Sequence, residues 1–359
     1  MDCGKILRVA DYAHYLVYTL LFFGAFYILI ISTNPNNQSM KPLSLFQRQN
    51  PPCQPSPPPT TGKKNTLKIY RDKLEEALAG ASTENKTVII AVVNKAYVDG
   101  DKSMLDLFLD GFWVGEGTRS LVKHLLIVAV DQTSYERCTF FGLHCYKLGT
   151  DGVDFVGEKV YMSPDFIKMM WRRTQFLGDV LKLGYSFIFT DSDVLWLRNP
   201  FLRLSDLNET LDLQISTDMF NGNERSESNP INTGFYMVRS NKRTMALFNS
   251  WYAMKNSSNG KKEQDVLNQL ISQGVLLELG LKVKFLNTQF FSGFCQVSRD
   301  VKSVVTVHAN CCRTITAKLA DLTAVIHDWH RFKSFSGDAN QTAAFRWSPH
   351  DHCADSWKH

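Results

Sequence analysis

Two aspartates, Asp191 and Asp193, stand between two apolar segments, residues 185–190 and 194–197. They are two positions apart, so on an extended chain both side chains point to the same side. Adjacent carboxylates are costly unless a cation joins them, and all-oxygen ligation suits magnesium, manganese or calcium. A solvated loop would also carry such a pair, but its flanks would not be apolar. The spacing therefore predicts a divalent-metal site.

The elements that position this pair read as alternating strands and helices. Residues 87–94, 123–131 and 185–190 are apolar runs typical of strands buried in a parallel sheet. Residues 103–113 and 163–183 have helical spacing, with Pro164 in the first turn of the second. Weaker strands are predicted over 212–217, 234–239, 281–286 and 303–307, and helices over 241–254 and 264–272. This pattern predicts one α/β domain, residues 67–359, with a mainly parallel sheet.

Ligands of such sheets bind beyond the carboxyl ends of the strands. Asn94, Asp131 and Asp191 each stand at such an end. We therefore expect them to border one cleft.

The N-terminal region reads as a membrane anchor. Residues 12–31 are uncharged and apolar, about the length that crosses a bilayer as a helix. Lys5 and Arg8 precede them and no further Lys or Arg occurs before Lys41, which predicts a cytosolic tail over 1–11 and a lumenal remainder. A cleaved signal peptide is the alternative, but the apolar run is long and no small-x-small site follows it.

Residues 32–66 hold 8 of the 12 prolines and show almost no apolar periodicity. This composition predicts an extended stem that holds the domain away from the membrane. The rival interpretation, a proline motif for a recognition domain, suits a lumen poorly.

The cysteines and glycosylation sequons fit a lumenal domain. Six of the 8 cysteines lie after the stem, an even number that favours disulfides, and Cys138 and Cys145 are close enough to close a small loop. The other pairings stay open among 15 connectivities, and no CxxC supports the alternative of a zinc site. Sequons follow the predicted anchor at Asn37, Asn85, Asn208, Asn256 and Asn340.

Composition excludes several classes of protein. At 44% hydrophobic and 21% charged, the chain is too apolar for a disordered protein. Its 40 basic and 35 acidic residues include no dense basic block, so a nucleic-acid partner is not expected. In a lumenal enzyme, the obvious use of the predicted metal is to hold a nucleotide diphosphate and to neutralise its charge as it departs.

Four segments together carry a family resemblance. Residues 189–200 (FTDSDVLWLRNP), 231–238 (INTGFYMV), 263–268 (EQDVLN) and 307–312 (VHANCC) resemble, in order, the plant nucleotide-diphospho-sugar transferases of glycosyltransferase family 77. That family includes extensin arabinosyltransferases and rhamnogalacturonan-II xylosyltransferases. The resemblance covers about residues 88–332. It implies a GT-A fold, a UDP-sugar donor, manganese with magnesium as the alternative, retention of anomeric configuration and a single-pass type II protein of the Golgi membrane.

The resemblance also implies roles for residues of this chain. Asp193 and His308 resemble metal ligands, and Asp191 resembles a group that touches the metal or the donor ribose. Asn94 resembles a nucleotide-binding position, Arg173 a group that neutralises the diphosphate, with Arg172 able to fill the same role, and Asp218 a ligand of sugar hydroxyls. The remaining implied site residues line the sugar cavity (Asn232, Thr233 and Gly234) or lie beneath the anomeric carbon (Gln264 and Asp265). Glu263 replaces an aspartate of several relatives and is given no catalytic role.

The sequence leaves the substrates open. Arabinofuranose, xylose and galactose all remain as donor sugars, and the acceptor is a cell-wall glycan or a hydroxyproline-rich glycoprotein. The second hypothesis is a catalytically inactive GT-A scaffold that is a partner subunit of a Golgi glycosyltransferase complex, and homo-oligomers or hetero-oligomers with other glycosyltransferases fit either one. A calcium-dependent carbohydrate-binding module is a third, which the buried strands disfavour. The segment 327–330 (HDWH) reads as packing rather than as a second metal site.

Overall fold

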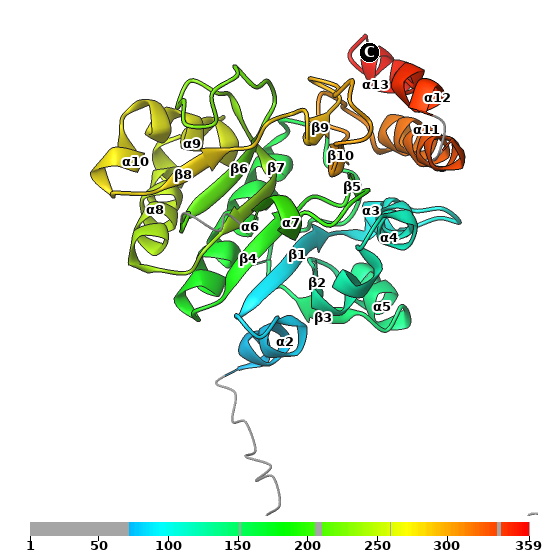
Figure 1. Ribbon diagram of the computed structural model, residues 1–359. Helices are drawn as coiled ribbons and strands as arrows, with labels where there is room; N and C mark the ends of the chain where they lie inside the picture. The colour runs from blue at the N-terminus through cyan, green and yellow to red at the C-terminus, as the bar shows by residue number, and fades with distance from the viewer. Residues whose placement is uncertain (1–71, 151, 205–209, 259, 336–338, 359) are drawn as a thin grey trace, which may run out of the picture. The chain divides into compact units, whose positions relative to one another are not determined.

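A seven-stranded mixed sheet forms the centre of the fold, with strand order β3-β2-β1-β4-β7-β6-β8 (Figure 1). The computed structural model describes residues 72–150, 152–204, 210–258, 260–335 and 339–358, which form one compact unit. The bounds of the strands in this sheet are β1 (Thr87–Val93), β2 (Leu125–Ala129), β3 (His144–Lys147), β4 (Ser186–Thr190), β6 (Leu213–Thr217), β7 (Ile231–Val238) and β8 (Val283–Phe285).

The sheet is mainly parallel, as predicted. β1 pairs in parallel with β2 and β4, β2 with β3, and β6 with β8. β7 is antiparallel to both of its neighbours, β4 and β6. The central strands read as apolar runs because both of their faces are covered: Val88, Ile89, Ile90 and Ala91 are all fully buried.

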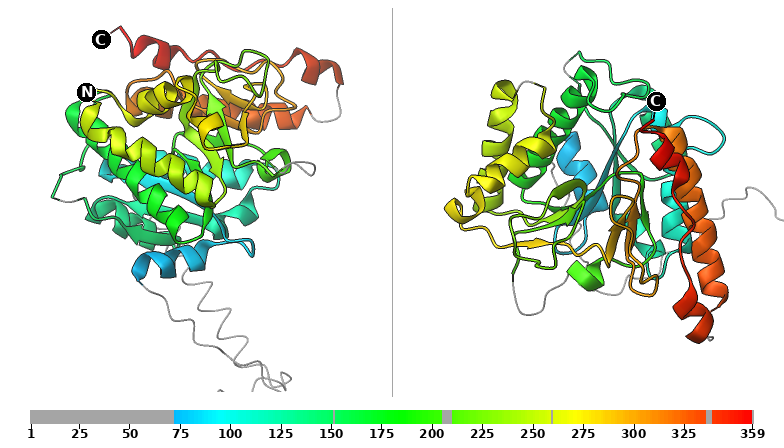
Figure 2. Two further views of the ribbon diagram at one scale, coloured as in Figure 1. Left: turned by 90° about the vertical axis from the view of Figure 1, so that its left-hand side faces the viewer. Right: turned by 90° about the horizontal axis from the view of Figure 1, so that it is seen from above.

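Helices cover both faces of the sheet (Figure 2). One apolar cluster packs α2 (Lys73–Ala81), α6 (Pro164–Lys182), α8 (Lys242–Ala253), α9 (Glu263–Ser272) and α10 (Val275–Glu278) on one face. On the other face a second cluster includes α4 (Met104–Val114) and residues of α5 (Gln132–Phe140) and α7 (Phe201–Leu204). The short helix α3 (Lys95–Val98) follows β1 directly.

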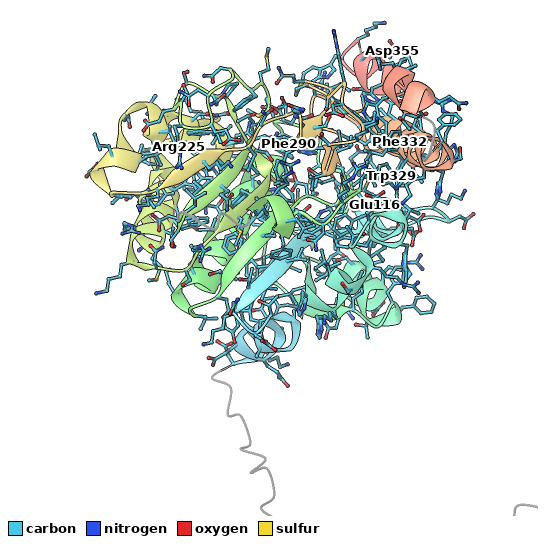
Figure 3. All side chains as sticks on the ribbon, in the orientation of Figure 1. Glu116, Arg225, Phe290, Trp329, Phe332 and Asp355 are labelled. Carbon is cyan, nitrogen blue, oxygen red and sulfur yellow. A yellow bond between two sulfur atoms is a disulfide. The ribbon has the colours of Figure 1, made fainter. Side chains whose placement is uncertain are left out.

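A small second sheet lies beside the first, with order β5-β10-β9. Its strands are β5 (Val194–Trp196), β9 (Phe291–Gly293) and β10 (Thr306–His308). It packs with α4 and with the long helix α11 (Ile315–Ser334), which carries the stacked rings of Trp329 and Phe332 (Figure 3). Two short helices, α12 (Ala339–Ala344) and α13 (Asp351–Asp355), follow.

Several predictions about the chain meet the structure here. The structure joins Cys138 to Cys145, the pair that the sequence suggested. The 327–330 segment packs within α11, where the buried carboxylate of Asp328 accepts hydrogen bonds from Ser348. Among the described residues, no helix is both long and apolar enough for a membrane span, and the predicted anchor at 12–31 lies outside them, as does the stem.

The predicted sequons divide in the same way. Asn85 and Asn256 are exposed. Asn37, Asn208 and the side chain of Asn340 lie outside the described part.

The buried carboxylate of Asp212 ties three segments together at the start of β6. Its side chain, 1% exposed, accepts hydrogen bonds from Asn241 Nδ2 at 2.8 Å, Arg243 Nη2 at 2.9 Å and the Lys282 amide at 2.9 Å. Burial alone would raise the pKa of Asp212, but these donors hold it below its usual range. The carboxylate therefore stabilises the fold in its charged form.

We predict that Asp212→Asn lowers the free energy of unfolding by about 2 kcal/mol at pH 7, with Arg243 contributing little because it is half exposed. Because the pKa of Asp212 is lower in the folded protein than in the unfolded chain, its charged form stabilises the fold above the unfolded-state pKa. This stabilisation is lost as the pH falls through the folded-state pKa. The difference between variant and wild type should therefore shrink below about pH 4. Urea unfolding at both pH values measures it. Asp179→Asn, which removes a half-exposed pair with Lys182, is the control and should change stability by less than about 0.5 kcal/mol.

Candidate active site

The chain brings Asp191, Asp193 and His308 together through strand pairing. β4 ends at Thr190, and the Asp191 amide donates to the Gly234 carbonyl on β7 at 2.7 Å. β5 begins immediately after Asp193 and pairs antiparallel with β10, which sets His308 opposite Val194. The backbone carbonyl of Asp193 also accepts from the Ala309 amide at 3.1 Å. Residues more than a hundred positions apart are thus fixed side by side by the small sheet.

These three side chains have the geometry of a metal-binding cluster. His308 Nε2 lies 3.4 Å from Asp193 Oδ1 and 4.0 Å from Asp191 Oδ2, and the three ligand atoms all lie within 4.8 Å of one another. Two carboxylates and an imidazole suit a divalent ion such as manganese or magnesium. Gly234 faces the cluster so closely that a Cβ there would stand 2.3 Å from His308 Cε1. The backbone of β7 thus leaves room for the cluster, and the residues fit a bound divalent ion.

Lys318, in the first turns of α11, is a site residue that sequence reasoning missed. Its Nζ lies 2.6 Å from Asp193 Oδ2, and its side chain is 17% exposed. Burial alone would raise the pKa of Asp193, but the charges of Lys318 and His308 hold it well below its usual range. No motif marks this lysine, and its contact with Asp193 spans 125 residues. Asp193 therefore already has one cationic partner.

Arg173, on α6, forms ion pairs with two carboxylates of the protein. Its guanidinium donates to Asp191 Oδ1 at 2.9 Å and to Glu263 Oε1 at 2.6 Å, and it stacks over the Phe189 ring. These two carboxylates oppose its charge, and the role of neutralising a diphosphate stays a prediction for Arg173. Arg172 does not share this position and donates instead to the Gly149 carbonyl.

Glu263 is more central than the sequence indicated. It is 1% exposed and accepts from Thr233 Oγ1 at 2.8 Å as well as from Arg173. We therefore read it as a positioning residue that fixes Arg173 and Thr233.

The predicted sugar-binding residues also gather near Gly234, where Asn232 Oδ1 would stand 2.9 Å from an added Cβ. Gln264 Oε1 accepts from the Thr233 amide at 3.0 Å, which orients the carboxamide. Asp218 accepts at one oxygen from Asn232 Nδ2 and Asn310 Nδ2, both at 2.9 Å. Asp265, the next residue on α9, is half-buried and does not line the cavity described below, since a helix turns it to a different face.

The irregular pairing of β6 with β7 explains how these polar groups reach the site. The register shifts between Ile215 and Ser216, so that Ile215 faces Tyr236 while Ser216 faces Asn232. The residues between Asn232 and Tyr236 are left without partners on β6, as in a β-bulge. Thr233 and Gly234, which lie beside the metal cluster, are therefore not paired with β6.

The metal cluster and the polar groups around it border one cavity of about 230 Å³, which is lined by Arg173, Asp191, Asp193, Asp218, Asn232, Thr233, Gly234, Glu263, Gln264, His308 and Lys318 but not by Asp265. Asn94, at the end of β1, also lines it, and its Nδ2 donates to the carbonyls of Phe155 and Gly157 at 2.8 and 2.9 Å. Asp131 has another role: it caps α5 and accepts from the Lys95 amide at 2.6 Å.

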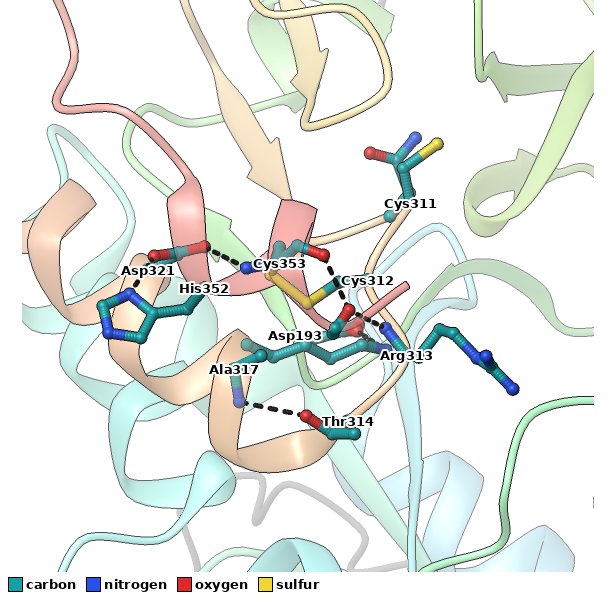
Figure 4. The surroundings of a disulfide bond; sticks show 12 residues. Asp193, Cys311, Cys312, Arg313, Thr314, Ala317, Asp321, His352 and Cys353 are labelled. Atoms are coloured by element: carbon teal, nitrogen blue, oxygen red, sulfur yellow. Dashed lines mark hydrogen bonds and ion pairs between the residues drawn. A yellow bond between two sulfur atoms is a disulfide. The ribbon is translucent and has the colours of Figure 1, made fainter. Parts of the chain in front are cut away.

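Two disulfides border the same wall of the cavity. Cys295 pairs with Cys311, and Cys312 pairs with Cys353 of α13 (Figure 4). The adjacent cysteines thus fasten the chain just after His308 to two different segments.

Comparison with known proteins identifies the family. Residues 120–322 match the model of the nucleotide-diphospho-sugar transferase family. Two uncharacterised proteins of Arabidopsis thaliana are 54% identical over 301 residues (82% of this chain, 88% of the relative) and 41% identical over 286 residues (79% and 74%). The Arabidopsis thaliana β-arabinofuranosyltransferase RAY1 is 25% identical over 231 residues, which is 61% of this chain and 41% of that protein. The mixed α/β sheet is accordingly a GT-A-like fold, and the chain belongs to the nucleotide-diphospho-sugar transferase family as a glycosyltransferase.

Proposed function

We propose that the chain is a retaining, metal-dependent glycosyltransferase of glycosyltransferase family 77 that moves a pentose or galactose from a UDP-sugar to a cell-wall glycan or glycoprotein. The observation that carries this proposal is the cluster of Asp191, Asp193 and His308 in a cavity that amide and carboxylate side chains also line. The cluster suits a diphosphate with its cation, and the amide and carboxylate groups suit a polyhydroxylated sugar. The similarity to RAY1 supports a pentose.

The charged side chains in and around the metal cluster support a cation there. Asp191, Asp193 and Glu263 carry three negative charges against the two positive charges of Arg173 and Lys318, which leaves one negative charge within this group of five residues. Asp191, Asp193 and His308 would hold a manganese or magnesium ion, which when bound neutralises charge on the departing diphosphate.

The residues of the chain have separate roles in the transfer. Lys318 is close enough to the cluster to pair with a phosphate oxygen once Asp193 binds a cation. Asp218 and Asn232 would receive the hydroxyls of the donor sugar. Gln264, oriented by the Thr233 amide, would lie beneath the anomeric carbon and stabilise developing positive charge.

Retention would follow from transfer on a single face of the sugar. The bond between the anomeric carbon and the phosphate oxygen breaks, the acceptor oxygen bonds to the same face, and the acceptor proton passes to the departing phosphate. This route needs no separate base. Asp265, turned away from the cavity, is left out of it.

The proposed setting is the Golgi lumen. We infer a cytosolic tail over residues 1–11, an anchor over 12–31, a stem over 32–66 and a lumenal domain from 67 onward. The disulfides and the exposed sequons Asn85 and Asn256 support an oxidising, glycosylating compartment. Assemblies with copies of this chain or with other glycosyltransferases fit this setting.

A panel of UDP-sugars tests the proposal. We expect the purified full chain to release UDP from one pentose or hexose donor in the presence of manganese, and to lose this activity on addition of EDTA. Manganese in excess over EDTA should restore it. Undiminished transfer under chelation would end the role of the metal, and failure of UDP to bind with manganese in calorimetry would favour an inactive scaffold.

A further inference from the structure

The mouth of the cavity carries two aromatic rings that the proposed donor site does not use. Tyr161 and Trp357 both line the cavity, with ring centroids 6.2 Å apart and planes at 70° to each other. Trp357 is 50% exposed although the polar edge of its ring is engaged, with Nε1 donating to the Cys311 carbonyl at 2.8 Å. The two rings therefore form an edge-to-face pair in which Trp357 is exposed and Tyr161, which also packs against Phe166, is half-buried; we call this pair the aromatic corner.

Hydrogen bonds tie the aromatic corner to two segments that line the cavity. Tyr161 Oη accepts from Lys262 Nζ at 3.1 Å, and Lys262 directly precedes Glu263 and Gln264 on the chain. Trp357 is hydrogen-bonded to the backbone carbonyl of Cys311, which lies three residues after His308. The aromatic corner thus lies between the start of α9 and the segment after His308. Asn94 also reaches the segment of Tyr161, through its hydrogen bond to the Gly157 carbonyl at 2.9 Å.

Cations flank both rings. Lys262 Nζ lies 4.9 Å from the Tyr161 ring centroid, and the Arg313 guanidinium lies 5.5 Å from that of Trp357. A sugar ring has apolar C–H faces and hydroxyl groups along its edge. The faces can pack on exposed aromatic rings, and the edge hydroxyls can accept hydrogen bonds from ammonium and guanidinium groups. A saccharide therefore fits this surface, because its C–H faces can pack on the rings and its hydroxyls can accept from the donors nearby.

The chain fixes Trp357 in place through a covalent link. Cys353, in the helix just before it, is 1% exposed and is bonded to Cys312, while Ser356 Oγ accepts from the Arg313 amide at 3.0 Å (Figure 4). Both anchors lie within five residues of His308 along the chain. The metal-cluster segment and the ring of Trp357 are thereby held as one unit.

We propose that the aromatic corner of Tyr161 and Trp357 binds a sugar ring of the acceptor glycan and that the Cys312–Cys353 disulfide positions it. This inference rests on the proposed transfer to a glycan and specifies where that glycan is held. In this proposal Trp357 determines acceptor binding, and the donor binds in the rest of the cavity.

The test compares two exposed tryptophans that differ in location. Trp113 is 53% exposed with Arg119 4.2 Å from its ring centroid, so it resembles Trp357 in exposure and in its cationic neighbour, yet it does not line the cavity. Saturation-transfer NMR on the full chain with UDP and manganese would measure binding of the methyl glycosides of L-arabinofuranose, D-xylose and D-galactose. A tetrapeptide of hydroxyproline is the peptide probe.

We expect at least one glycoside to bind, and Trp357→Ala to raise its Kd about threefold to tenfold, with a smaller change in the Kd for UDP. Trp113→Ala should match the wild type, Trp357→Phe should retain most of the affinity, and the paired change Cys312→Ser with Cys353→Ser should behave as Trp357→Ala does. A wild type that binds UDP but no glycoside, or equal glycoside binding by the two alanine variants, would overturn the proposal. Binding that depends on Trp357 but is confined to the peptide would overturn the sugar assignment. A chain that binds glycosides but not UDP would instead refute the proposed function.

Discussion

Replacing Asp193 by alanine should reduce turnover by about 10³-fold, the scale expected when several kcal/mol of transition-state stabilisation by a metal site are lost. The same variant should lose manganese binding in calorimetry. Asp193 lies 3.4 Å from His308 Nε2 and is 3% exposed, so no solvent-exposed carboxylate can replace it.

The contact with Lys318 makes this experiment harder to interpret than the sequence indicates. Removal of Asp193 leaves a largely buried ammonium without its 2.6 Å partner, and such a change costs about 3–5 kcal/mol of stability. Loss of activity in Asp193→Ala alone could therefore reflect unfolding. The double variant Asp193→Ala with Lys318→Met removes both charges and should recover most of the stability while remaining inactive. Turnover by a folded double variant near that of the wild type would contradict the role of Asp193.

Lys318 also shows which part of the site could be predicted from the sequence. Asp191 and Asp193 are two positions apart and flanked by apolar runs, so the local pattern was enough to mark them. Lys318 and Glu263 act through contacts that bridge 125 and 90 residues, and such contacts appear only when the topology is known. His308, Gln264 and Gly234 were marked by resemblance rather than by spacing.

The fold shows the same division. The buried strands and the long helix α6 were predicted within a few residues of their bounds, because apolar runs and helical spacing are local signals. β7 begins at Ile231, three residues before the predicted start, since the polar residues Asn232 and Thr233 continue the strand while lining the cavity. The three-residue strands β5 and β9 are too short to carry a period, and the pairings of Cys295 and Cys312 depend on tertiary proximity.

Replacing Gly234 by alanine should also disable the metal site, because the added methyl group would stand against the ligands. The Cβ of Gly234→Ala would stand 2.3 Å from His308 Cε1, 2.8 Å from Asp191 Oδ2 and 2.9 Å from Asn232 Oδ1, so at least the imidazole must move. Overpacking of this kind costs about 1–3 kcal/mol of stability. We expect manganese affinity and turnover to fall at least about 100-fold, because the displaced imidazole can no longer bind the same ion as the two carboxylates.

Gly178 in α6 provides the matched control for this substitution. A Cβ there would meet only Phe248, at 3.6 Å, which is ordinary van der Waals contact. Because alanine favours a helix over glycine, Gly178→Ala should raise the free energy of unfolding by up to about 1 kcal/mol and leave activity intact. Thermal unfolding and manganese calorimetry on both variants separate the two effects. If Gly234→Ala bound manganese as tightly as Gly178→Ala does, the imidazole of His308 would not be a ligand, and the cluster would have to be reassigned to the two carboxylates alone.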